Sequence, residues 1–137
     1  LSNFVCVIRK PFLFNYNIKL NFSKIKGDDD ITHIWNAGPC EFISIFSQAV
    51  YVITDSFHGT AFSINFNIPF TTLLNPASNI NSRALSILKL TGTESRLIYD
   101  NGENKEPDTL DIDFTPINII IEKNREKSLK FIKENLA

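Results

Sequence analysis

The sequence predicts an α/β fold, a doubly wound parallel sheet in one domain over residues 1–137. Two observations support this expectation. Short runs of β-branched and aromatic residues alternate with segments whose apolar residues recur every three or four positions. Strands and helices in alternation form parallel sheets, because each helix returns the chain to the edge where the next strand starts. A chain of 137 residues is also long enough to bury a core of its own.

Five short apolar segments, bounded by turn-forming residues, are predicted as strands. In chain order they are residues 4–8, 31–35, 49–54, 70–74 and 96–99. The segment 11–22 is rich in aromatic residues and asparagine, and it is compatible with a further strand or with an ordered loop.

Four helices are predicted between and after these strands. One starts at residue 39, two span 59–66 and 83–90, and the last runs from 115 to about 135. Pro39 and Pro116 suit the first position of a helix, where the fixed φ of proline fits and its missing N–H is not needed. Thr115 is the expected N-cap of the last helix, and Gly92 is placed to end the third.

The composition narrows the class of protein. Charged residues make up 21% of the sequence and the net charge is −1, so no broad basic surface for nucleic acid is predicted. The apolar runs fall far short of the roughly 20 residues that a membrane-spanning helix needs. No N-terminal signal peptide is visible. We therefore expect a cytoplasmic protein without a membrane span.

The cysteines and the missing methionine carry two further expectations. Cys6 and Cys40 each lack a second cysteine or a histidine at ligand spacing, so they are predicted to be buried free thiols. The sequence contains no methionine and starts Leu1-Ser2-Asn3. We interpret it as an excised domain whose function needs a partner half.

A polar hexapeptide, Asp55-Ser56-Phe57-His58-Gly59-Thr60, joins the predicted strand 49–54 to the next helix; we call it the His58 turn. Such turns present side chains and helix N–H groups at the carboxyl end of a strand, where α/β sheets bind anionic ligands. Gly59 permits close backbone approach, and Ser56 and Thr60 supply hydroxyl donors. His58 can transfer a proton near neutral pH. The alternative is that Asp55 or Ser56 only caps the helix and His58 is structural.

Segments on both sides of the His58 turn form a combined pattern. They are Gly38-Pro39-x-Glu41-Phe42-Ile43, Ala49-x-Tyr51-Val52-Ile53-Thr54 running into the turn and on to Phe62-Ser63-Ile64, and Pro69-Phe70. Downstream they are Asn81-Ser82-Arg83 with Leu85, Leu88 and Leu90, then Arg96, and then Ile112-Asp113-Phe114 before a charged helix with Arg125 and Ser128. Over roughly residues 38–137, this pattern resembles the polysaccharide pyruvyl transferase family.

The resemblance implies a single Rossmann-like domain, one half of a two-domain enzyme similar to B-type glycosyltransferases. Members of the family transfer the enolpyruvyl group of phosphoenolpyruvate to two sugar hydroxyls, forming a pyruvate ketal and releasing phosphate. The expected protein is of bacterial type and acts in surface or exopolysaccharide biosynthesis on a saccharide or lipid-linked saccharide. The chain corresponds to the C-terminal domain of such an enzyme, with the N-terminal domain absent. We expect the isolated domain to be inactive and to need no cofactor besides the donor substrate.

The resemblance also implies roles for particular residues. His58 matches the histidine of the family motif and is the expected general acid or charge stabiliser, since the methylene carbon of phosphoenolpyruvate must be protonated. Ser56, Gly59 and Thr60 are the expected substrate-binding residues of the turn. Some members carry an Arg where this chain has Ser56, and a Lys on the loop after the Pro-Phe strand. Arg83 is the nearest replacement cation and suits bidentate phosphate or carboxylate binding; the alternative is a surface cation.

Two other functions remain open. A B-type glycosyltransferase would bind a nucleotide-sugar at the same helix N-terminus, but it also needs a carboxylate for the ribose, and none is well placed downstream of the turn. A non-catalytic domain that keeps the fold is the second alternative. Asp111-x-Asp113 resembles a metal-binding motif but precedes a helix, so it is interpreted as turn chemistry, and no metal is predicted. His33 and Trp35 are expected to pack in the core, with stacking on a sugar as the alternative.

Overall fold

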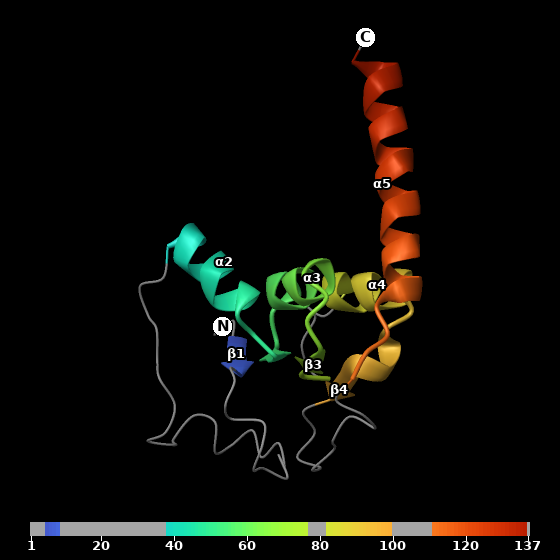
Figure 1. Ribbon diagram of the computed structural model, residues 1–137. Coiled ribbons are helices and arrows are strands. Elements are labelled where there is room, and N and C mark those ends of the chain that lie inside the picture. The colour runs from blue at the N-terminus through green and yellow to red at the C-terminus, as the bar shows by residue number, and fades with distance from the viewer. Residues whose placement is uncertain (1–4, 9–37, 77–81, 100–110, 137) are drawn as a thin grey trace, which may run out of the picture.

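The computed structural model describes residues 5–8, 38–76, 82–99 and 111–136, and for residues 5–8 it describes the backbone only (Figure 1). Strands and helices alternate along the described chain, as the sequence predicts. In order they are β1 (Val5–Ile8), α2 (Pro39–Ser47), β2 (Tyr51–Thr54), α3 (Phe57–Asn65), β3 (Phe70–Leu74), α4 (Ser82–Thr91), the 3-10 turn η2 (Glu94–Arg96), β4 (Leu97–Tyr99) and α5 (Thr115–Asn135). The predicted segments 11–22 and 31–35, with His33 and Trp35, lie outside the described residues.

The strands form one sheet in the order β1-β2-β3-β4. β2, β3 and β4 are parallel, with Thr54 beside Thr72 and Thr72 beside Leu97. β1 pairs antiparallel with β2, so the prediction of an entirely parallel sheet is wrong at this edge. An apolar run marks a strand but carries no information on its direction. The connection from β1 to β2 is long enough for either orientation, so the sequence pattern could not decide between them.

The described helices pack on one face of the sheet. β2, β3 and β4 follow one another in space as in sequence, and right-handed connections then place α3 and α4 on the same side. α3 contacts α4, β2 and β3, and Figure 1 shows α2, α3 and α4 along one side of the strands. The observed architecture is therefore a three-stranded parallel sheet alternating with helices. Helices on the opposite face, as in a doubly wound sheet, stay a prediction.

One apolar cluster joins the helices to the sheet. Its buried members come from α2, β2, α3, β3, α4, α5 and the connection before β3, and are Phe46, Val52, Ile64, Ile68, Phe70, Leu88 and Ile117. Phe46 packs between Phe42 and Phe62, with ring centroids 4.8 Å and 5.7 Å away. Burying such side chains stabilises each by about 1.5–3 kcal/mol relative to exposure.

The opposite face of the sheet is also buried, as both faces of a parallel sheet usually are. Alternation along the strands directs Tyr51, Ile53, Thr71, Leu73 and Ile98 to that side, and each is at most 7% exposed. The hydroxyls of Tyr51 and Thr71 are 2.7 Å apart and hydrogen-bonded. Burial raises the pKa of Tyr51 above its ordinary value, while the bond to Thr71 and the charge of Arg96 oppose that shift.

Helix ends agree closely with the sequence predictions, with one correction at the start of α5, and a second correction concerns the burial of Cys40. Pro39 starts α2, and Gly92 follows α4 with φ of +68°, a conformation that glycine adopts without strain. At the start of α5, however, the N-cap position is occupied by Phe114 rather than Thr115, without a side-chain capping bond. In the turn before the helix, Asp113 Oδ1 accepts the Thr115 N–H at 2.9 Å, and this bond lowers the pKa of Asp113. Cys40 lies exposed on α2, so the prediction that it is buried is wrong.

The C-terminal part of α5 extends away from the rest of the molecule (Figure 1). Every residue from Arg125 to Leu136 is exposed, including Leu129 at 49% and Phe131 at 66%. No helix in the described part of the chain combines the length and hydropathy that crossing a bilayer requires.

Candidate functional site

The His58 turn and Arg83 lie at the same edge of the sheet. β2 runs into the turn at Thr54, and β3 ends at Leu74 ahead of the connection to α4. Because β2 and β3 are parallel neighbours, their carboxyl ends meet at one edge, and α3 and α4 both start there. This is the position at which α/β sheets bind ligands.

The backbone of the His58 turn is fixed by Thr54. Its Oγ1 accepts the N–H of Ser56 at 3.0 Å, which bends the chain sharply out of β2. Ser56 then occupies the N-cap position of α3, where its carbonyl accepts the N–H of Thr60 at 3.0 Å. The Ser56 side chain makes no capping bond and is 5% exposed. The alternative that the Ser56 side chain serves as a helix cap therefore does not describe this turn.

Gly59 allows α3 to press directly against β2. A Cβ atom at this position would lie 2.9 Å from both Cβ and Cγ2 of Thr54, and closer still to its hydroxyl. Real side chains do not tolerate such distances. The close approach predicted for Gly59 is thus made to the strand that carries the turn, and it sets the distance between α3 and the sheet.

Thr60 points toward the sheet rather than to the outside. It is fully buried, and its hydroxyl donates to the Ser56 carbonyl at 3.2 Å and pairs with the Thr72 hydroxyl of β3 at 2.9 Å. One turn later, the Ser63 hydroxyl donates to the Gly59 carbonyl at 2.8 Å. These bonds fasten the first turn of α3 to β2 and β3, so the backbone at the start of α3 is held rigidly.

His58 and Arg83, by contrast, are exposed and are linked by Phe57. The Phe57 and His58 rings meet edge to face, with centroids 5.5 Å apart and an angle of 71° between their planes. The Arg83 guanidinium carbon lies 4.3 Å from the Phe57 ring centroid, within the range of a cation–π contact. The structure therefore places the predicted acid and the predicted cation, which are 25 residues apart in sequence, against the same Phe57 ring.

Phe57 is the residue of this group that sequence reasoning missed. An aromatic residue next to a histidine in an α/β turn is most simply a core residue, and Phe57 is in fact only half-buried. The sequence signal available was that this aromatic residue and a cation, Arg83, stand near the starts of two consecutive predicted helices.

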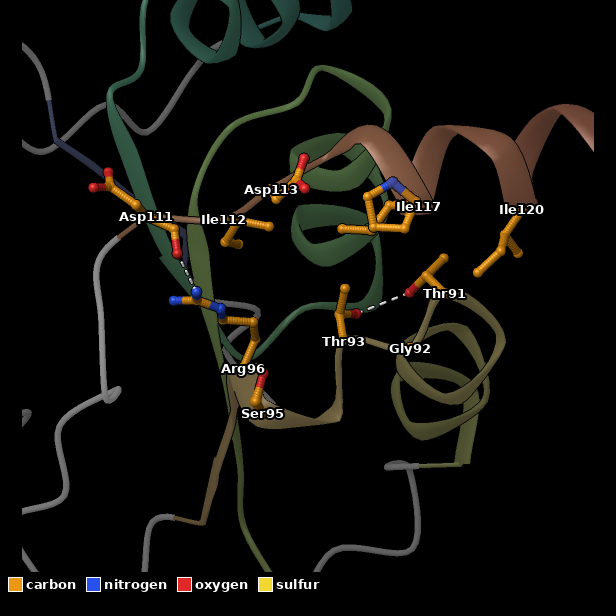
Figure 2. A pocket seen from close by; sticks show the side chains of 11 residues that line it. Thr91, Gly92, Thr93, Ser95, Arg96, Asp111, Ile112, Asp113, Ile117 and Ile120 are labelled. Atoms are coloured by element: carbon orange, nitrogen blue, oxygen red, sulfur yellow. Dashed lines mark hydrogen bonds between the residues drawn. The ribbon is translucent and has the colours of Figure 1, made fainter.

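A separate pocket of about 330 Å³ opens at the amino edge of the sheet, where the parallel strands start, between the end of α4 and the start of α5 (Figure 2). It contains none of the predicted site residues. Arg96 borders it, is only 7% exposed and donates to the Asp111 carbonyl. Asp113 also borders it and accepts the Thr115 N–H in the turn before α5, as expected of turn chemistry. Among residues 5–8, 38–76, 82–99 and 111–136, no group of three or more His, Cys, Asp or Glu could hold a metal ion.

The family model for polysaccharide pyruvyl transferases matches residues 5–76, just over half of the chain. The chain belongs to the polysaccharide pyruvyl transferase family. Membership implies a transferase, and the matched region contains the whole His58 turn. The match starts further upstream than residue 38, where the resemblance began, and it ends before Arg83. No curated protein and no solved structure matches the chain.

Proposed function

We propose that this protein transfers the enolpyruvyl group of phosphoenolpyruvate to two hydroxyls of a saccharide, forming a pyruvate ketal. The observation that carries the proposal is the position of His58: exposed, at the start of α3, at the carboxyl edge of the sheet and inside the family match. Arg83, in the first turn of α4, lies at the same edge and contacts the Phe57 ring.

His58 has the position and chemistry of a general acid. Its proton goes to the methylene carbon of phosphoenolpyruvate, which becomes a methyl group, while one saccharide hydroxyl adds to the neighbouring carbon. Phosphate then leaves as the second hydroxyl adds. One hydroxyl proton returns to His58 and the other leaves with phosphate, so the imidazole is ready for the next cycle.

Arg83 and the first turn of α3 supply the positive potential for the donor. Phosphoenolpyruvate carries a phosphate and a carboxylate, and both match the planar fork of a guanidinium. The first N–H groups of α3 have no acceptor within their own helix and favour an anion there. The N–H of Ser56 already bonds to Thr54, and the N–H and hydroxyl of Thr60 already bond to Ser56 and Thr72, so these two residues contribute by holding the turn rigid. Gly59 contributes its backbone N–H in the first turn of α3.

We also propose the acceptor, the cellular compartment and a partner domain. The acceptor is a saccharide or lipid-linked saccharide of surface or exopolysaccharide biosynthesis, and the reaction takes place in the cytoplasm. A second Rossmann-like domain completes the cleft, as in B-type glycosyltransferases.

Thermal unfolding of the full-length protein tests the proposal. Phosphoenolpyruvate at about 100 times its Kd stabilises a binding protein by about 2.7 kcal/mol, which is several degrees in Tm. We expect this shift for the wild type and for Lys89→Ala, which removes a cation from the far end of α4, and a much smaller shift for Arg83→Ala. A shift with nucleotide-sugars and none with phosphoenolpyruvate would contradict the proposal and favour a B-type glycosyltransferase.

A further inference from the structure

We infer that Phe57 is a positioning residue: its ring holds the Arg83 guanidinium beside His58, so that α4 supplies the cation that the His58 turn itself lacks. The inference rests on the proposed function and deepens it. The turn carries Ser56 two residues before His58, and the Ser56 side chain is uncharged and buried. A cation for the donor must therefore come from another element.

The geometry allows one ring to serve both neighbours. Arg83 lies against the Phe57 ring, 4.3 Å from its centroid, and His58 meets the same ring edge to face at 5.5 Å. Phe57 is half-buried at the start of α3, and the Thr54 and Thr60 bonds fix the backbone on which it stands. The ring is thus a rigid platform in contact with two exposed side chains, the His58 imidazole and the Arg83 guanidinium.

A platform matters because an exposed arginine is otherwise mobile. Ordering a free arginine side chain on binding costs about 1.5–2 kcal/mol of rotamer entropy. A guanidinium already held against a ring has lost part of that freedom before the ligand arrives, and the ligand then binds more tightly. Arginine suits this arrangement better than lysine, since its planar group stacks on aromatic rings and keeps its edge donors for an anion.

The place of Arg83 along α4 supports a role beyond helix stability. It is the second residue of the helix, where a positive charge opposes the helix dipole, whereas Lys89 lies in the last turn, where a positive charge is favourable. Helix stability alone therefore does not explain Arg83. The contact with Phe57, the residue next to His58, offers a functional explanation for a cation at this position.

Binding of phosphoenolpyruvate to the full-length protein, measured by calorimetry, tests the inference with four variants. Phe57→Tyr keeps the ring and should bind within about twofold of wild type. Phe57→Leu keeps an apolar side chain without a ring and should bind about two- to fivefold more weakly, the size of an exposed cation–π contact. In an Arg83→Ala background, Phe57→Leu should cause no further loss. Equal losses from Phe57→Leu with and without Arg83 would overturn the inference.

A second measurement examines the contact without any ligand. In proton NMR spectra, ring current from Phe57 should move the δ-methylene protons of Arg83 upfield in wild type and in Phe57→Tyr, and the shift should vanish in Phe57→Leu. Its absence from wild type would overturn the inference. If wild type binds phosphoenolpyruvate and Phe57→Leu binds equally well, only the role of Phe57 fails. If wild type does not bind it at all, the proposed function fails and the inference fails with it.

Discussion

The parallel strands start at one side of the sheet, the amino edge, and end at the other, the carboxyl edge. Each of these edges carries an arginine, and the two arginines differ in their surroundings. Arg96, at the amino edge, is 7% exposed and donates to the Asp111 carbonyl beside Tyr51. Arg83, at the carboxyl edge, is exposed against an aromatic ring next to His58. A guanidinium enclosed by protein acceptors stabilises the fold, whereas one that faces solvent on a fixed platform can meet an incoming anion.

This difference favours the His58 turn over the pocket at the amino edge as the candidate site. The pocket of about 330 Å³ lies at the amino edge, between α4 and α5, where Arg96 and Asp113 are already engaged by the protein (Figure 2). The carboxyl edge offers an exposed imidazole and an exposed cation on neighbouring helices. Substitution of His58 at the carboxyl edge should therefore lower activity with little effect on stability, whereas substitution of Arg96 at the amino edge should lower stability with little effect on binding.

The largest effect is expected for His58→Ala. Loss of a general acid lowers kcat by about 10²–10⁴-fold, while the free energy of unfolding should change by less than about 0.5 kcal/mol, because His58 is exposed. Phosphate release from phosphoenolpyruvate, with a panel of saccharide acceptors, measures the first quantity and urea unfolding the second. A variant that keeps wild-type turnover would remove His58 from the mechanism.

The opposite outcome is expected for Arg96→Ala. Removing this buried guanidinium leaves the Asp111 carbonyl without its donor, and the free energy of unfolding should fall by about 3 kcal/mol. Binding of phosphoenolpyruvate, measured below the unfolding transition, should stay within about twofold of wild type. Lys89→Ala, an exposed cation on α4, is the control and should alter stability by less than about 0.5 kcal/mol. Loss of binding without loss of stability would place the ligand at the amino edge instead.

Much of the fold and part of the site could be predicted from the sequence. β3 has the predicted bounds and Pro39 starts α2 as expected, because a short apolar run between turn-forming residues and the geometry of proline are local properties. The direction of β1 and the exposure of Cys40 depend on tertiary packing and were wrongly predicted. Within the candidate site, the location of His58 between a strand and a helix followed from the sequence, and its role stays a prediction. The contact between Phe57 and Arg83 depends on the spatial relation of two helices, which the sequence pattern does not contain.

Gly59→Ala should give a smaller but diagnostic loss of stability. An alanine for glycine in a helix normally stabilises by about 0.5–1 kcal/mol. Here the added methyl group meets Thr54, so α3 must move off β2, and we expect a loss of about 1–3 kcal/mol in urea unfolding. An increase in stability would show that α3 does not press against β2 as described.

The smallest effect concerns pH and belongs to the amino edge. The pKa of Tyr51 is raised in the folded protein, so its contribution to stability is fully present below the unfolded value near 10.0 and is lost as pH rises through the folded value. Stability measured by urea unfolding should therefore decline in alkaline solution, and less steeply in Tyr51→Phe. Equal slopes for the two proteins would show that Tyr51 does not ionise more readily on unfolding.

An NMR titration of the full-length protein with phosphoenolpyruvate tests the central claim most directly, since it locates the ligand on one edge of the sheet. We expect the amide signals of residues 56–60 and of Arg83 to shift together, with one common Kd, while those of residues 91–96 and 111–120 stay in place. Shifts confined to residues 91–96 and 111–120 would contradict this expectation.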